Sequence, residues 1–355
     1  MVLWLNDYND LRWQINVLIL KIKHKIILFS LKIIILSIIN FYFLILISII
    51  ISLRVSSNLL LWIRLELNIL RFLPIISSKE NIEIENSIKY FLIQRWASVI
   101  FLIRFFFFYM INNNFYMLIN LRLFMKLGVS PFHSWFIAIL KTSSLITLFM
   151  LSTVQKIIPL VIIFNIKLNN FLIFIVIFLT LIFIIILLPR TININKVLAI
   201  SSINNIIWLI MSVLFSIKII FLFMMIYMYL VMGFINIYSF YNINMFTQMN
   251  SIIFFDKFFL VIVFMSLGGM PPILGFLRKI IILKIILNNF ISLVIVFIIV
   301  ISSVLLLYFY LSRIYFYLSN IPSLKINFKL SLISIKKILY IISIVYINII
   351  FVVYV

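Results

Sequence analysis

Long apolar runs, separated by short polar connections, dominate the hydrophobic pattern from residue 33 to the C-terminus. Runs of about 20 apolar residues are long enough to cross a bilayer as helices. A transmembrane β-barrel does not fit, because its strands alternate apolar and polar residues and segments such as 171–188 do not. The pattern therefore predicts an all-α polytopic membrane protein.

The runs predict about 10–12 transmembrane helices, one of them interrupted in the middle. The expected spans are 33–53, 59–76, 90–111, 115–127, 132–150, 153–166, 171–188, 197–216, 219–241, the interrupted span 258–287, 290–311 and 335–355. No connection is long enough to hold a second domain, so residues 33–355 are expected to form a single transmembrane helical domain. Residues 1–32 are set apart as an N-terminal extension whose status the pattern leaves open.

Composition agrees with this assignment: 66% of the 355 residues are hydrophobic and 10% are charged, against roughly 25% charged in a soluble domain. The net charge of +22 is weak evidence for a nucleic-acid partner, because residue types with AT-rich codons dominate the chain, as in a mitochondrial gene. Cysteine is absent, and His24 and His133 are the two histidines. Thiolate-held iron–sulfur clusters and bis-histidine haem are therefore not expected here.

One carboxylate stands apart from the other six acidic residues, which lie outside the apolar runs or at their edges. Glu66 falls inside the span 59–76, where a lone charge is costly unless it is neutral, paired or hydrated. A functional carboxyl and a structural, salt-bridged one both fit this position. Helix periodicity places Arg64 and Arg71 on one face and Glu66 well away from it, so neither is its expected partner.

Three lysines inside the predicted spans lie beside helix breakers. The groups are Lys126 with Gly128 and Pro131; Lys156 with Pro159; and Lys279 with Gly268, Gly269, Pro271, Pro272 and Gly275. Broken membrane helices line protein or water-filled cavities. A desolvated lysine gives up its proton readily, whereas arginine stays charged, so the pattern favours proton relay. The structural alternative is that the glycines only allow close helix packing.

Six segments in order resemble the chain 2 family of NADH-ubiquinone oxidoreductase, the antiporter-like subunits of the complex I membrane arm. They are 60–68 with Pro74, 89–94, 125–135, 155–159, 266–276 and, more weakly, 196–203 with Trp208. The most specific are Met-Lys-Leu-Gly-Val-Ser-Pro-Phe-His-Ser-Trp at 125–135 and Ser-Leu-Gly-Gly-Met-Pro-Pro-Ile-Leu-Gly-Phe at 266–276. The resemblance covers roughly residues 33–310.

The resemblance implies a proton-translocating subunit of the mitochondrial inner membrane, encoded in the organelle, that carries no redox centre. The implied relay consists of Glu66, Lys126 as its partner, Lys156 at the centre, Lys196, and Lys279 toward the exit. No metal or cofactor is expected on this chain; NADH, FMN, iron–sulfur clusters and ubiquinone are expected elsewhere in the complex. The implied partners are the other membrane-arm subunits and inner-membrane lipids, with no nucleic acid.

The sequence departs from the family pattern at Ala138, where an acidic residue is usual, at Asn195, where Arg is common, and at Asn205, where His is often found. These departures affect the central part of the relay. The sequence is also compatible with two other interpretations. One is a stand-alone cation/proton antiporter, and the other is a purely structural membrane subunit whose buried charges fix helix registry.

Overall fold

A computed structural model describes residues 58–77, 81–107, 116–166, 170–241, 243, 245–252, 254–271, 273–288 and 293–319. The predicted spans 33–53 and 335–355, the extension 1–32 and Pro272 lie outside the described residues. Everything stated below concerns the described part of the chain.

The described residues form helices joined by short turns, and the predicted all-α class is confirmed. The α-helices are α2 (Asn58–Ile76), α3 (Asn81–Phe107), α4 (Tyr116–Leu127), α5 (Ser134–Thr142), α6 (Leu145–Phe149), α7 (Gln155–Ile166), α8 (Asn170–Leu187), α9 (Ile194–Val213), α10 (Ile217–Tyr241), α11 (Phe254–Gly268), α12 (Leu274–Asn288) and α13 (Leu293–Ser319). A π-helix, η2 (Met150–Val154), joins α6 to α7, and a 3₁₀ helix, η3 (Phe246–Ser251), precedes α11.

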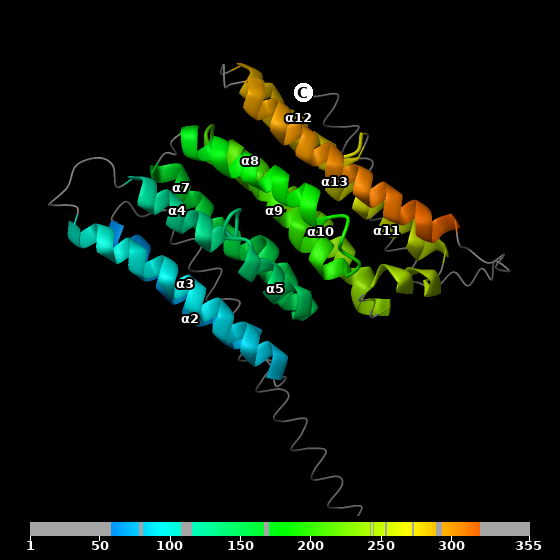
Figure 1. Cartoon of the computed structure of the whole chain (residues 1–355), viewed down its shortest axis with the longest axis horizontal. Coiled ribbons are helices and arrows are strands. Elements are labelled where there is room, and N and C mark those ends of the chain that lie inside the picture. Colours follow the sequence, from blue (N-terminus) through cyan, green and yellow to red (C-terminus); the bar gives the residue numbers. More distant parts are fainter. Residues whose placement is uncertain are drawn as a thin grey trace, which may run out of the picture.

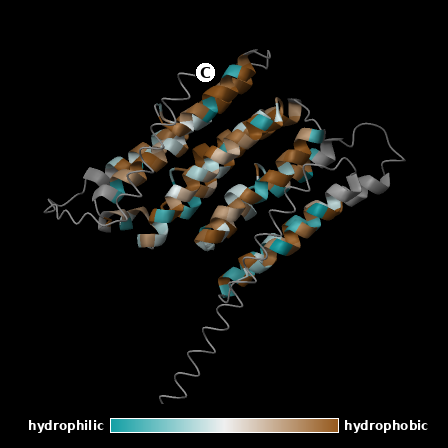
Figure 2. Cartoon of the chain, turned by 180° about the vertical axis from the view of Figure 1, so that it is seen from behind, coloured by the Kyte–Doolittle hydropathy of each residue, from teal (hydrophilic) through white to brown (hydrophobic). Residues whose placement is uncertain are grey.

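The helices lie side by side approximately in chain order, with α2 and α3 at one end and α12 and α13 at the other (Figure 1). Helix α9 lies in the middle and contacts α5, α7, α8, α10, α12 and α13. All but one of its residues are buried, among them the polar residues Ser201, Ser202, Asn204 and Asn205. Polar side chains therefore reach the centre of the bundle, and Figure 2 shows hydrophilic patches along otherwise hydrophobic helices.

Four described helical spans are long and apolar enough to cross a membrane by themselves: Leu145–Asn165, Ile194–Val213, Ile217–Tyr241 and Leu293–Tyr315. The apolar helix Phe171–Leu187 is shorter. Many large apolar side chains stay exposed on the bundle surface, including Leu293 (72%) and Tyr315 (76%). Such a surface suits contact with hydrocarbon or with other membrane proteins.

The predicted start of α3 at residue 90 is wrong, because the helix begins at Asn81. Glu83 lies in its first turn, where a carboxylate interacts favourably with the helix N-terminus. Glu85 and Lys89, four residues apart, form an exposed ion pair with an N–O distance of 2.5 Å. These charge interactions stabilise the first turns of α3 in a stretch that the hydrophobic pattern assigned to a polar connection.

The predicted boundary between residues 150 and 153 is also wrong. The chain breaks instead at Ser143 and Ser144, both in extended conformation, and then stays helical from Leu145 through η2 into α7. Ser152 and Thr153 donate their hydroxyls to the Phe149 carbonyl and so remain within the helix.

Pro159 does not break its helix, contrary to the prediction. It lies inside α7, and the irregular segment is η2, which ends two residues before Lys156. A π-helix widens the helical turn, so the local distortion of this helix lies at η2 and not at Pro159. Lys156 therefore projects from just beyond an irregular turn.

Candidate functional site

Glu66 is buried on α2, and the structure pairs it with Arg95 of α3 rather than with Lys126. The distance from Arg95 Nη1 to Glu66 Oε2 is 2.6 Å, with 9% of the Glu66 side chain and 38% of the Arg95 side chain exposed. Helix periodicity within α2 could not show which neighbouring helix faces the carboxylate. The predicted direct pair with Lys126 is corrected to a pair with Arg95.

Lys126 lies in the last turn of α4, beside a small polar cavity that Lys156 also lines. Within the described residues its Nζ atom has no hydrogen-bond partner, and the charges of Glu66, Arg95 and Arg122 lie close enough to act on it. The cavity measures about 20 Å³ and is lined by Leu65, Asn68, Ile69, Tyr90, Gln94, Lys126, Leu127, Trp135, Phe136, Leu151, Gln155, Lys156 and Pro159. That volume suits a single water molecule.

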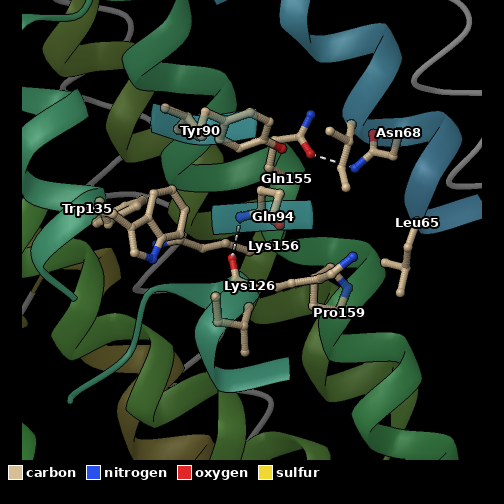
Figure 3. Close-up of a pocket in the computed structure, with 13 residues that line it drawn as sticks. Leu65, Asn68, Tyr90, Gln94, Lys126, Trp135, Gln155, Lys156 and Pro159 are labelled. Atoms are coloured by element: carbon tan, nitrogen blue, oxygen red, sulfur yellow. Dashed lines mark hydrogen bonds between the residues drawn. The ribbon is translucent and has the colours of Figure 1, made fainter. Parts of the chain in front are cut away.

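Amide side chains from three helices surround this cavity (Figure 3). Asn68 of α2 donates to Gln155 Oε1 of α7 at 2.5 Å, and Gln94 of α3 donates to the Lys126 carbonyl at 3.4 Å. Trp135 of α5 donates its indole N–H to the Met125 carbonyl at 3.2 Å. These bonds fix the walls of a polar pocket between two buried lysines.

The turn between α4 and α5 supports the same pocket. Gly128 adopts a left-handed conformation (φ 69°), and Pro131 lies in the turn that follows, so both predicted breakers separate the two helices. The turn brings Trp135 back onto the end of α4, because its indole bonds Met125.

Lys156 is 3% exposed and reaches toward the central helix α9. Its Nζ donates to the Ser202 carbonyl at 3.3 Å. The same atom lies 4.9 Å from the centre of the Phe136 ring and 6.0 Å from that of Tyr227. Aromatic faces and one carbonyl thus support an ammonium group deep in the bundle.

Lys279 is 4% exposed on α12 and is held by the break between α11 and α12. Its Nζ donates to the Gly268 carbonyl at 2.5 Å and lies 5.6 Å from the centre of the Trp208 ring. Gly269 has φ 83°, and a Cβ there would collide with the Lys279 amine. Gly275 lies within α12, where a Cβ would overlap the Ser266 carbonyl, so it serves close packing rather than a break.

Sequence reasoning missed Arg278, which is 1% exposed. Its guanidinium donates to Asn205 Oδ1 at 3.3 Å, to the Leu267 carbonyl at 3.2 Å and to the Gly275 carbonyl at 3.3 Å. Its Cζ atom lies 4.8 Å from the Phe223 ring centre and 5.5 Å from that of Tyr227. The available signal was an arginine directly beside a candidate lysine, within the span already predicted to be interrupted.

The remaining candidates lie apart from these contacts. Lys196 is half-buried in the first turn of α9, six residues before Ser202. Ala138 is exposed on α5, whereas Asn195 is buried at the start of α9. The described residues contain no group of three or more His, Cys, Asp or Glu residues that suits a metal ion.

Taken in order, the buried polar groups form a path through the apolar core. It starts at the Glu66–Arg95 pair, passes Lys126 and the cavity, and reaches Lys156. Beyond Lys156 lie Tyr227 and the Arg278–Asn205 pair, and the path ends at Lys279. The path places ionisable side chains in series within a largely apolar interior.

The bundle with broken helices and intramembrane lysines defines a class of antiporter-like membrane subunits, and residues 56–306 match the family described as NADH:quinone oxidoreductase/Mrp antiporter, TM. The chain is 33% identical over 266 residues to NADH-ubiquinone oxidoreductase chain 2 of Artemia franciscana, covering 73% of this chain and 84% of that one. It is 32% identical over 310 residues to the same protein of Anopheles gambiae, covering 82% and 90%.

The fold is similar to a chain of respiratory complex I from Thermus thermophilus solved with bound aureothin, with a TM-score of 0.75, 15% identity, and coverage of 88% of this chain and 78% of that chain. The chain therefore belongs to the NADH-ubiquinone oxidoreductase chain 2 family, as its motifs indicate.

Proposed function

We propose that the chain is a proton-translocating membrane-arm subunit of mitochondrial respiratory complex I and that its relay consists of Glu66, Lys126, Lys156 and Lys279. The observation that carries the proposal is the polar path described above, in which buried lysines follow one another through an otherwise apolar bundle. Intramembrane ionisable groups mark ion and proton pathways, because their burial is costly without such a role. Family membership supports the same conclusion.

The proposed driving force for proton transfer is electrostatic repulsion. A charge change arriving from the quinone-reducing end alters the Glu66–Arg95 pair and the charge around Lys126, which shares a cavity with Lys156. Repulsion across that cavity drives the proton of Lys156 toward Lys279. Moving one charge against 100 mV costs about 2.3 kcal/mol, a modest demand for charges that interact in a low-dielectric interior.

Lys196 enters the proposal only as a side branch, since the contacts that connect the other lysines do not include it. Water bound near Asn205 takes the place of the histidine often found there in the family. The finer assignments are part of the same proposal: location in the mitochondrial inner membrane, mitochondrial encoding, neighbouring membrane-arm subunits and lipids as partners, and NADH, FMN, iron–sulfur clusters and ubiquinone on other subunits.

Substitution of Lys156 by Met tests the proposal. Met fills a similar volume without a charge, so the variant complex should assemble and oxidise NADH but lose coupled proton pumping. The measurement is the number of protons moved per NADH in sealed membrane vesicles. Lys141→Met is the matched control, because Lys141 is exposed on α5. Normal pumping by the Lys156 variant would reject the relay.

A further inference from the structure

Arg278 lies between the two innermost lysines of the proposed relay, and the relay as proposed gives it no part. It directly precedes Lys279 on α12 and is 1% exposed. The Tyr227 ring lies 5.5 Å from its Cζ atom and 6.0 Å from the Lys156 Nζ atom, so one aromatic side chain separates it from the central lysine. A proton that moves directly from Lys156 to Lys279 in the proposed relay would pass close to this guanidinium.

The charge of Arg278 is not neutralised by a carboxylate among the described residues. The groups that contact it are uncharged: Asn205 Oδ1, the carbonyls of Leu267 and Gly275, and the rings of Phe223 and Tyr227. An arginine stays protonated in proteins, so the charge is permanent. Snorkelling to an interface does not explain a side chain so completely buried, and an unpaired membrane charge is retained at a cost.

The surroundings of Arg278 suit bound water. Within the described residues its Nη1 atom has no hydrogen-bond partner, and buried donors of this kind are usually satisfied by water. A cavity of about 10 Å³, lined mostly by apolar side chains together with Ser152, Ser201 and Tyr227, shares Tyr227 and Leu267 with the surroundings of Arg278. That volume approaches the space of one water molecule. A hydrated link would conduct protons in either direction, including backward when the enzyme is idle.

We propose that Arg278 is an electrostatic seal: its fixed positive charge bars passive proton leakage between Lys156 and Lys279. Positive groups exclude protons and cations from narrow hydrated passages by this means. During turnover, repulsion originating at Lys126 pushes the proton past the barrier, whereas a leaking proton receives no such push. The inference rests on the proposed relay, and it assigns to Arg278 a positioning and barrier role without proton transfer.

The test measures passive proton conductance of the whole complex in liposomes, without NADH, under an imposed potassium diffusion potential and with a pH-sensitive dye inside. Arg278→Gln should raise the conductance roughly tenfold, equivalent to about 1.4 kcal/mol off the barrier. Arg278→Lys replaces a permanently charged group with one that can release its proton when buried, so its conductance should fall between those of the unmodified complex and Arg278→Gln. Lys284→Gln is the matched control, because it removes one charge from an exposed position on the same helix.

A second variant keeps the test decisive if Arg278→Gln fails to assemble. Asn205→Asp places a carboxylate 3.3 Å from the Arg278 guanidinium and neutralises its charge without removing it. This variant should also leak. No added leak in either charge-neutralising variant would overturn the seal.

The leak test of Arg278 can fail independently of the pumping test of Lys156, because the leak is measured without turnover. Normal pumping by Lys156→Met rejects the relay whatever the Arg278 variants do. If Lys156→Met loses pumping and Arg278→Gln shows no added proton conductance, the seal is rejected and the relay is retained.

Discussion

At the scale of single residues, the buried charges differ in how they are compensated. Glu66 has an ion-pair partner in Arg95, whereas Lys156 and Lys279 rely on one carbonyl each and on aromatic faces. A carbonyl and a ring stabilise an ammonium less than a carboxylate does, so the charges of these two lysines are less fully compensated than that of Glu66. The paired end and the lysine end of the path are therefore suited to different tasks, response to charge and transfer of protons.

The Glu66–Arg95 pair leads to a prediction about assembly. Arg95→Gln removes the partner and leaves the Glu66 carboxylate buried without compensation, which is more damaging than removing both charges. Arg95→Gln alone should therefore lower the amount of assembled complex several-fold. The double variant Glu66→Gln with Arg95→Gln should restore much of that amount. The measurement is the amount of assembled complex on native gels. A double variant that assembles no better than the Arg95 variant would contradict the pairing.

Sequence alone singled out Glu66 and three lysines as candidates, because charges inside apolar runs stand out. It did not identify their partners. Periodicity fixes the direction of a side chain within one helix, but the facing helix is set by tertiary packing. Arg278 was missed for a related reason, because the role of a buried arginine depends on which groups surround it in the folded chain.

At the scale of helices, the turn between α11 and α12 determines where Lys279 lies. Gly269 adopts φ 83°, and the absence of a side chain there leaves room for the Lys279 amine to reach the Gly268 carbonyl. The break is thus a binding site for an ammonium group, formed by backbone that a continuous helix would not expose.

Gly269→Ala should displace the Lys279 amine and strain the turn by about 1–2 kcal/mol, since left-handed backbone disfavours side chains. We expect reduced proton pumping per NADH with most of the complex still assembled. Gly268→Ala is the neighbouring comparison: its Cβ would meet Leu307 at 3.4 Å, an ordinary contact, so its loss should be smaller. Equal effects of the two substitutions would argue that packing, and not the position of Lys279, is responsible.

Helix existence was easier to predict than helix boundaries. The interruption of the span 258–287 was predicted correctly, because glycines and prolines fall together there between two apolar runs. The boundary near residue 150 was misplaced, since Ser152 and Thr153 satisfy their hydroxyls on the helix backbone and Pro159 is accommodated within α7. Such side-chain to backbone bonds depend on rotamers, which the hydrophobic pattern does not encode.

At the scale of the whole molecule, both ends of the bundle present apolar side chains outward. Trp96 on α3 is 67% exposed and Phe297 on α13 is 67% exposed. Membrane lipid can cover single residues of this kind, but the polar path inside the bundle needs an input of charge change from elsewhere. A subunit of a larger enzyme would receive that input from its neighbours, whereas a transporter that works alone would receive it from a bound cation.

Separation of detergent-solubilised membranes on native gels distinguishes these two possibilities. If the chain is a membrane-arm subunit, mass spectrometry should find its peptides in the band with NADH dehydrogenase activity. The chain purified alone into liposomes should then exchange no sodium or potassium for protons, because nothing drives or resets the charge at Glu66. Recovery as a free protein, together with cation-dependent proton movement in those liposomes, would instead support a stand-alone antiporter. The same polar path would then be driven by the bound cation in place of electron transfer.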